Sequence, residues 1–283
     1  MSILQSVTAN DDPQLMDGHP NWDVEPILTR RSRRYFGFRS VADRLFAVVL
    51  LVPGLPLIFL LGLIVRLTSR GPAIHSQSRV GKEGRPFRIY KIRTMIDNAE
   101  KKTGVVWTKP NDPRITHIGA VLRKLHLDEL PQLFNVLRGD MSLIGPRPER
   151  PEFVEVLSQE IPDYLNRLAV RPGITGLAQV HLPPDTDLQS VRRKLTLDLE
   201  YIDQAGPFLD LRLLLCSALR IVGVPGDSAM HACVLRRPAI VSDDHSLPAD
   251  SIIHTPGGII VPPPHQKAGK LNGHSRRTAK TRR

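Results

Sequence analysis

Two adjacent carboxylates, Asp128 and Glu129, lie just before a short predicted helix, where they could support phosphate chemistry. Pro131 suits the first turn of a helix and Gly139 suits the residue after its end, so we expect the helix at about residues 130–138. The dipole and free N–H groups at its start favour anions, which would keep Asp128 ionised and would attract a phosphate. One carboxylate could attack phosphorus while the other holds Mg²⁺ against a diphosphate. An ordinary capping pair is the alternative.

Basic side chains beside Gly or Pro in nearby segments could bind the phosphate groups of a substrate. A planar Arg side chain on a rigid turn can hold a phosphate through two parallel hydrogen bonds. A solvated basic face, or contact with lipid head groups, is the alternative. The basic residues in question are Lys91, Arg93, Arg114, Arg123, Lys124, Arg147 and Arg171.

An uncharged apolar run from Leu45 to Val65 is long enough to be a membrane helix. Arg-rich residues 30–44 precede it, and Arg66 and Arg70 follow, so both flanks carry the positive charge typical of the cytoplasmic side. Residues 53–56, Pro-Gly-Leu-Pro, should break or kink the helix, which leaves each half too short to cross ~30 Å of hydrocarbon. We expect a re-entrant helix. A kinked complete span and the core helix of a soluble protein are the alternatives.

The composition limits the classes of partner and of scaffold. The net charge of +11 indicates an anionic partner such as a membrane face or a phosphorylated substrate. Aromatic residues make up only 5% of the chain, so stacking on single-stranded nucleic acid is not expected. The two cysteines, Cys216 and Cys233, exclude a disulfide scaffold and a Cys-rich zinc site.

Changes in composition divide the chain into four parts. The first is a polar, acidic lead-in that we expect to be disordered, and the last is a basic, Pro-rich tail expected to be disordered as well. Between them lie the membrane segment and a globular part whose Leu-rich end, residues 208–222, could be a core helix or could lie among lipid head groups. The four parts are residues 1–29, 30–70, 71–223 and 224–283.

Ordered blocks of this sequence resemble the bacterial sugar transferases, the monotopic polyprenyl-phosphate phosphoglycosyl transferases, in their minimal form. The resemblance covers about two thirds of the chain, and the blocks are long and contiguous. The blocks are the Pro-broken segment at 44–66, SRVGKEGRPFRIYKIRTM at 78–95, residues 111–148 around HLDELPQLFNVLRGDMSLIGPRP, RPGITGLAQV at 171–180 and KLTLDLEYI at 194–202.

This resemblance implies a compact α/β catalytic domain that faces the cytoplasm, on a re-entrant helix and interfacial helices at the bacterial inner membrane. It implies transfer of a sugar 1-phosphate from a UDP-sugar to undecaprenyl phosphate with release of UMP, the first membrane step of exopolysaccharide, capsule or O-antigen synthesis. By the match, Asp128 is the nucleophile that forms a covalent phospho-sugar intermediate, and Glu129 is a Mg²⁺ ligand. The residues expected to hold phosphates are Lys91, Arg93, Arg123, Arg147 and Arg171.

The sequence departs from the family pattern at Ile92, where Phe is usual, and at Leu177, where Trp is usual, so the sugar stays open. A homo-oligomer also stays open. A non-catalytic membrane scaffold in a polysaccharide assembly complex is the alternative function. A further alternative is a conventional glycosyltransferase that holds its metal with Asp185 and Asp187.

Overall fold

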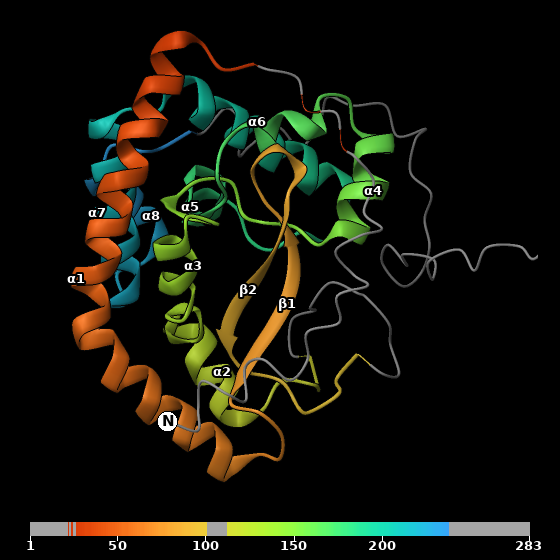
Figure 1. Ribbon diagram of the computed structural model, residues 1–283, viewed down its shortest axis with the longest axis vertical. Helices are drawn as coiled ribbons and strands as arrows, with labels where there is room; N and C mark the ends of the chain where they lie inside the picture. The colour runs from red at the N-terminus through yellow and green to blue at the C-terminus, as the bar shows by residue number, and fades with distance from the viewer. Residues whose placement is uncertain (1–21, 23, 25–26, 101–111, 238–283) are drawn as a thin grey trace, which may run out of the picture.

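The computed structural model describes residues 22, 24, 27–100 and 112–237 of the chain (Figure 1). The helices are α1 (Arg30–Thr68), α2 (His117–Lys124), α3 (Gln132–Arg138), α4 (Pro151–Glu160), α5 (Leu177–His181), α6 (Leu188–Gln204), α7 (Pro207–Ile221) and α8 (Gly226–Ala232). The strands are β1 (Ile74–Val80), β2 (Pro86–Ile92), β3 (Ser142–Ile144) and β4 (Gly173–Thr175), and the 3₁₀ turns are η3 (Lys82–Gly84), η4 (Leu127–Glu129) and η5 (Tyr164–Ala169). These elements confirm the mixed α/β class.

The N-terminal helix α1 is 39 residues long and contains both Pro53 and Pro56. The side chain of Thr29 accepts a hydrogen bond from the backbone N–H of Ser32 and so caps the first turn. The two prolines led us to expect a helix broken into two halves, but the structure shows one continuous helix. One helix accommodates both prolines and changes direction part-way along its length, which is the usual effect of Pro in a helix (Figure 1).

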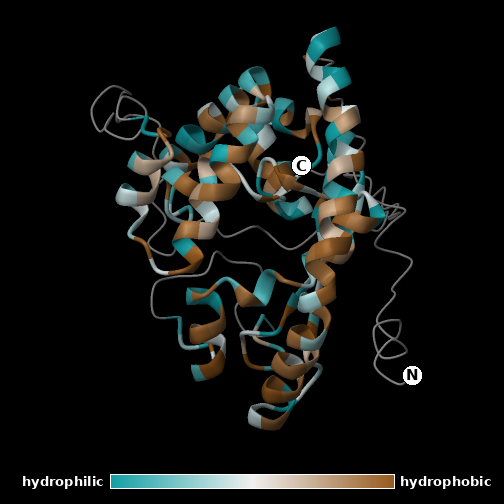
Figure 2. Ribbon diagram, turned by 90° about the vertical axis from the view of Figure 1, so that its left-hand side faces the viewer, coloured by the Kyte–Doolittle hydropathy of each residue, from teal (hydrophilic) through white to brown (hydrophobic). Residues whose placement is uncertain are grey.

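One face of α1 packs against the rest of the protein, and the opposite face is exposed. Small residues allow close packing, since Gly54 faces Leu133 of α3 and Gly62 faces Ala73. Figure 2 shows this helix at the edge of the molecule, hydrophobic over much of its length. By length and composition it could cross a membrane. The exposed large apolar residues of its central part are Leu45, Phe46, Val48, Val49, Leu50, Val52, Leu55, Phe59, Leu60 and Leu63.

A buried polar cluster joins the first half of α1 to the domain. Arg39 forms ion pairs with Asp43 in the same helix, at 3.4 Å, and with Asp210 of α7, at 3.1 Å. The hydroxyl of Tyr35 donates a hydrogen bond of 2.6 Å to Asp210 as well. Arg39 also donates to the hydroxyl groups of Tyr201 and Ser142 and to the carbonyl of Ile144. These contacts fix α1 against β3, α6 and α7.

The strands form two small sheets that support the loops between the helices. Strands β1 and β2 pair antiparallel, with Ser76 opposite Tyr90, and β3 and β4 pair parallel, with Ser142 opposite Gly173. The main core lies where α1, α3, β3, α5, α6 and α7 meet. Its buried members include Leu51, Leu133, Val136, Met141, Leu143, Leu177, Leu197, Tyr201, Leu213 and Cys216.

The Leu-rich segment forms helix α7, one face of which belongs to the core. Leu213 and Cys216 are fully buried in the main core, whereas Phe208 and Leu211 on the other face are exposed. The helix is therefore part of the core and also presents an apolar outer face. The helix predicted at about residues 130–138 is confirmed as α3.

Two segments predicted to be disordered are folded in part. Trp22 of the lead-in is buried and packs on Gly84 at the turn between β1 and β2. In the predicted tail, α8 packs on α7, and Leu235 is completely buried. The prediction was wrong for these parts. Isolated apolar residues such as Trp22 and Leu235 are buried there, and isolated residues produce no periodic pattern in the sequence. Residues 1–21 and 238–283 lie outside the described residues.

We predict that Arg39→Met lowers the free energy of unfolding by about 3–5 kcal/mol, because Asp43 and Asp210 would stay buried without their cation. Denaturant unfolding of the purified protein in detergent micelles measures the change. Arg33→Met, at an exposed position of the same helix, is the matched control and should change stability by no more than about 0.5 kcal/mol. Equal losses in the two variants would contradict the docking role of Arg39.

Candidate active site

The predicted carboxylate pair lies in η4, a single 3₁₀ turn between α2 and α3. His126 starts this turn in the left-handed backbone region, with φ of 55°, which His tolerates better than most residues. Pro131 precedes the first residue of α3 and Gly139 ends that helix with φ of 84°, as predicted. The side chain of Asp128 points into the protein, since the residue is only 7% exposed.

One carboxylate oxygen of Glu129 gathers two of the predicted basic residues. Its Oε1 accepts a hydrogen bond of 2.8 Å from Lys91 Nζ on β2 and one of 3.0 Å from Arg147 Nη2 on the turn after β3. The side chains of Glu129 and Lys91 are 11% and 20% exposed, so their ion pair is largely shielded from water, whereas the Arg147 side chain is 42% exposed and reaches Glu129 from the solvent side. Three segments far apart in the sequence therefore meet at the carboxylate pair.

Asn135 explains how β2 comes to lie beside the pair. This residue of α3 is completely buried. Its side-chain Oδ1 accepts from the backbone N–H of Tyr90, at 3.2 Å, and its Nδ2 donates to the carbonyl of Arg88, at 2.6 Å. The amide thus satisfies the backbone groups on the free edge of β2. Because Lys91 follows directly, this register carries its ammonium group to Glu129.

The two carboxylates have opposite pKa shifts. Burial raises the pKa of Glu129, but Arg147 and Lys91 outweigh burial and hold that pKa well below its usual range. Burial, and then the charge of Glu129, raise the pKa of Asp128 above its usual value, against the charges of nearby basic side chains. This direction differs from the expectation that the helix start would keep Asp128 ionised. Environments that separate two neighbouring carboxyl pKa values are typical of catalytic pairs.

Arg123 lies on the Asp128 side of the site. Its Nε donates a hydrogen bond of 2.8 Å to Thr94 Oγ1, and its charge acts on Asp128. The position depends on Gly119, because a Cβ there would overlap the carbonyl of Thr94. Helix α2 can therefore approach the end of β2 closely and brings Arg123 with it.

The structure brings Lys91, Arg123 and Arg147 to the carboxylate pair but places Arg93 and Arg171 elsewhere. Arg93 donates to the carbonyls of Ser69 and Arg70 just after α1. Arg171 donates from Nε to the carbonyl of Gly139, at 2.7 Å, at the far end of α3. Each side chain bonds backbone carbonyls just after a helix, Arg93 after α1 and Arg171 after α3. The spacing of residues in the sequence does not reveal such contacts.

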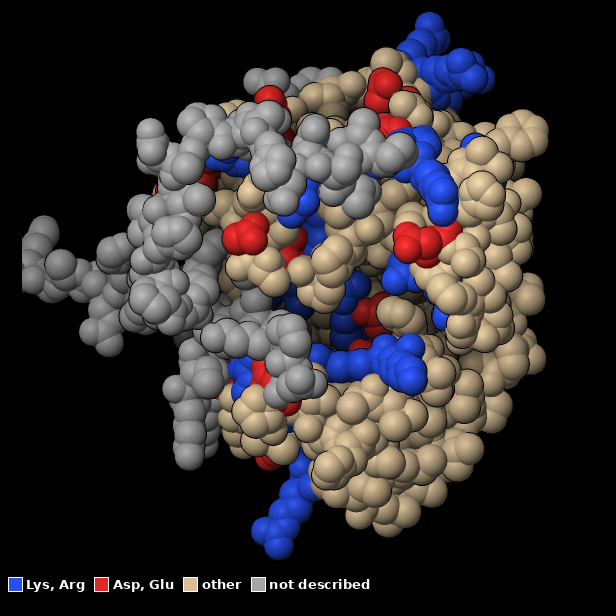
Figure 3. All heavy atoms as spheres, turned by 180° about the vertical axis from the view of Figure 1, so that it is seen from behind, with Lys and Arg blue, Asp and Glu red and all other residues tan. Residues whose placement is uncertain are grey.

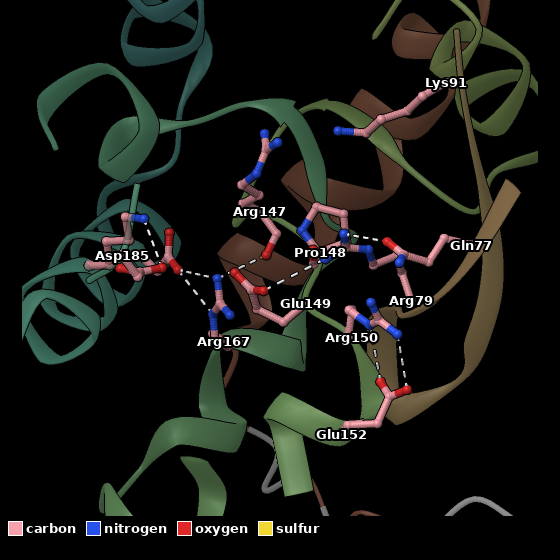
Figure 4. Close-up of polar contacts among 12 residues, drawn as sticks. Gln77, Arg79, Lys91, Arg147, Pro148, Glu149, Arg150, Glu152, Arg167 and Asp185 are labelled. Atoms are coloured by element: carbon pink, nitrogen blue, oxygen red, sulfur yellow. Dashed lines mark hydrogen bonds and ion pairs between the residues drawn. The ribbon is translucent and has the colours of Figure 1, made fainter. Parts of the chain in front are cut away.

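Further basic residues, which the sequence did not single out, surround this site. Figure 3 shows Lys and Arg side chains, with acidic ones, lining a hollow on the back of the molecule. Figure 4 shows Arg79 of β1, Lys91 of β2 and Arg147 of the turn after β3 in one region, while Arg150 points toward Glu152. Burial lowers the pKa of Arg79 to about 10. The sequence signal was available, because Arg79 stands in the block SRVGKEG.

The carboxylate pair could bind Mg²⁺ only together with substrate phosphates that complete its coordination. Among the described residues, no group of three or more His, Cys, Asp or Glu side chains could hold a metal ion. Mg²⁺ commonly uses one or two protein carboxylates together with substrate phosphates and water. Glu129, with its lowered pKa, can serve as such a ligand beside a diphosphate.

The alternative metal motif at Asp185 and Asp187 is not assembled. Asp185 forms an ion pair with Lys194 at 2.8 Å. Asp187 caps α6 instead, where its side chain accepts a hydrogen bond of 2.7 Å from the backbone N–H of Ser190. The two carboxylates therefore have separate structural partners.

Comparison with known proteins identifies one family. The family model described as bacterial sugar transferase matches residues 34–223, a range that includes α1 from its second turn, the carboxylate pair and the basic turns. A Bacillus subtilis protein, provisionally named an undecaprenyl-phosphate N-acetylgalactosaminyl 1-phosphate transferase, is 50% identical over 141 residues, which cover 50% of this chain and 78% of that protein.

Two further relatives carry related names. The UDP-N-acetylgalactosamine-undecaprenyl-phosphate N-acetylgalactosaminephosphotransferase of Aeromonas hydrophila is 45% identical over 61% of this chain, which spans only 40% of that protein's length. The UDP-glucose:undecaprenyl-phosphate glucose-1-phosphate transferase of Caulobacter vibrioides is 41% identical over 62% of this chain and 67% of its own. The named sugars differ between these relatives, whereas the lipid acceptor is the same.

We predict that Asn135→Leu lowers the free energy of unfolding by about 1–3 kcal/mol, because two backbone groups of β2 lose their partner. Asn166→Leu, which removes an exposed side-chain contact, is the control, with a change of about 0.5 kcal/mol or less. Chemical denaturation in detergent measures both. An Asn135→Leu protein as stable as the wild type would contradict this role.

Proposed function

The chain belongs to the bacterial sugar transferase family, and from this premise we propose that it transfers a sugar 1-phosphate from a UDP-sugar to undecaprenyl phosphate. UMP is released, and the lipid product initiates exopolysaccharide synthesis. The observation that carries this proposal is the buried Asp128 beside Glu129, which Lys91 and Arg147 hold in place. An unreactive capping pair would need neither burial nor two cations on one oxygen.

The proposed reaction has two displacements at one phosphorus atom. A carboxylate oxygen of Asp128 attacks the sugar-bearing phosphorus, and the bond from that phosphorus to the bridging oxygen breaks, so UMP leaves with the bonding electrons. An oxygen of undecaprenyl phosphate then attacks the same phosphorus. The bond to Asp128 breaks, which regenerates the carboxylate and forms the diphosphate-linked lipid sugar.

The basic residues supply fixed positive charge for both steps. Lys91 and Arg147 approach from the Glu129 side and Arg123 from the side of α2. Charge that is already in position where phosphate oxygens gain negative charge stabilises the transition state without reorganisation. A Mg²⁺ ion held by Glu129 would neutralise diphosphate charge and assist departure of UMP.

We also propose that α1 is re-entrant, with the catalytic domain on the cytoplasmic side of the inner membrane. Both ends of α1 contact the same domain, through Arg39 with Asp210 at one end and through Val65 with Ile92 at the other. The helix bends between these contacts, both flanks are basic, and its outer face is apolar. A straight span would require its two ends to lie on opposite sides of the bilayer.

The non-catalytic scaffold remains the second candidate function, and the reacting residue separates the two. We predict that Asp128→Asn lowers turnover by about 10³-fold or more, while the protein still partitions to membranes. A radiolabelled UDP-sugar assay with undecaprenyl phosphate, run over a panel of UDP-sugars with detection of UMP, measures this loss. Asp163→Asn, at an exposed turn, is the matched control and should stay active. Near-normal product formation by Asp128→Asn would refute the nucleophile.

The covalent step has its own readout, because protein trapped with donor and digested should carry the phospho-sugar mass on the Asp128 peptide. Glu129→Ala should lose the Mg²⁺-dependent part of the activity. Activity that neither EDTA nor this substitution reduces would exclude Glu129 as a metal ligand. Release of UDP instead of UMP would indicate a conventional glycosyltransferase.

For the membrane topology, we predict that Arg33→Cys and Arg70→Cys, at exposed positions near the two ends of α1, react with an impermeant maleimide from the same side. The native Cys216 and Cys233 are buried and provide a low background. Inside-out and right-side-out vesicles supply the two orientations. Labelling of the two sites from opposite sides would establish a complete span.

A further inference from the structure

The turn that carries Arg147 to Glu129 is held by two arginines from other elements. Residues 145–150, Gly-Pro-Arg-Pro-Glu-Arg, follow β3. Arg167 of η5 donates from Nη2 to the carbonyl oxygen of Arg147, at 2.9 Å, and Arg79 of β1 donates from Nη1 to that of Pro148, at 3.1 Å (Figure 4). Two arginine side chains thus donate to the carbonyl oxygens of consecutive residues, Arg147 and Pro148, and fix the backbone of the turn.

Arg167 is itself fixed from three sides. Its Nε and Nη2 donate to Asp198 Oδ2 of α6, at 3.0 and 2.8 Å, and its Nη1 donates to the hydroxyl of Tyr164, at 3.0 Å. The side chains of Arg167 and Asp198 are only 6% and 3% exposed. A chain of direct contacts thus runs from α6 through Arg167 to the Arg147 carbonyl, and on through the Arg147 side chain to Glu129.

Stability alone does not account for this buried pair. Removing two charges from water costs free energy that their attraction seldom exceeds, and apolar residues of the same volume often serve as well or better. The neighbouring positions Leu195, Leu197 and Leu168 are apolar and buried, so an apolar pair would suit this environment. Only a planar guanidinium can bond Asp198, Tyr164 and a backbone carbonyl at once.

We propose that Arg167, held by Asp198, is a positioning residue for the transfer reaction: its bond to the Arg147 carbonyl orients the turn so that the Arg147 guanidinium meets Glu129. The inference rests on the proposed function, since the orientation of Arg147 matters only if the Asp128–Glu129 pair is the reacting centre. Arg167 itself lies behind the turn and bonds its backbone, so it acts through Arg147.

A double-mutant cycle separates positioning from a merely structural role. Arg147→Ala removes the guanidinium but keeps the carbonyl, so the bond from Arg167 and its structural contribution survive. In the otherwise wild-type full-length protein, Arg167→Lys should lower kcat/KM by about 100-fold, the scale of a misplaced catalytic group. In the Arg147→Ala background, the same change should lower kcat/KM by less than about threefold, because no guanidinium is left to position.

The measurement uses UMP release from a UDP-sugar with undecaprenyl phosphate by protein purified in detergent, with thermal unfolding followed in parallel. Asp198→Asn keeps the size and one acceptor oxygen, so it supplies a gentler second variant with the same predicted pattern if Arg167→Lys does not fold. Arg237→Lys is the matched control, because Arg237 pairs with Glu200 on the same helix α6, at 2.7 Å, away from the turn. Its kcat/KM should change by less than about twofold.

Each outcome decides the matter. If the fold-losses in kcat/KM of the two single variants multiply in the double variant, Arg167 acts independently of Arg147 and the inference is overturned. Full activity of Arg167→Lys also overturns it. A wild-type protein that releases UMP, together with a fully active Arg147→Ala, overturns the inference and leaves the proposed function intact. Absence of UMP release by wild type with every UDP-sugar tested overturns both.

Discussion

One carboxylate oxygen, Oε1 of Glu129, receives both Lys91 and Arg147, and the geometry of the site depends on this shared contact. Lys91 and Arg147 are 56 residues apart in the sequence, so their meeting at Glu129 depends on the tertiary structure. Each is delivered by its own support: the Asn135 amide holds the strand of Lys91, and Arg167 holds the turn of Arg147. The position of this oxygen is therefore set by two partners that other contacts hold in place.

The same contact accounts for the difference between the two carboxylates. Two cations on Glu129 keep it ionised, and its fixed negative charge then acts on the buried neighbour Asp128. A desolvated carboxylate is less stabilised by water, which favours its attack on an electrophile in the proposed reaction. The two carboxyl groups therefore have different pKa values because of their charged surroundings, and the short helix behind them contributes mainly the position of the turn.

Local signals in the sequence predicted the local structure well. Pro131 and Gly139 bound α3, and the pair Asp128–Glu129 falls where that helix predicts it. Contacts between distant segments were not predictable in this way. Lys91 and Arg93 are two residues apart and both looked like phosphate ligands, yet only Lys91 reaches the pair, because the carbonyls after α1 take the donors of Arg93. Apolar neighbours could have drawn attention to Asn135 and Asp198, since a polar residue inside a buried face needs a partner.

The apolar helix and the reacting carboxylates form one mechanical unit, which bears on how a lipid substrate can reach a buried site. Gly54, near the middle of α1, lets Leu133 of α3 pack against the helix, and Leu133 follows Asp128 by little more than one helical turn. At the other end, Arg93 binds the carbonyls after α1 and continues directly from the strand of Lys91. Both sides of the site are thus joined to α1 by short contacts, so in the proposed re-entrant arrangement the depth of α1 in the bilayer would set the height of Asp128 above it. Under that proposal a lipid phosphate confined to the head-group layer would meet the carboxylate at a fixed level, which would replace a three-dimensional search by a lateral one.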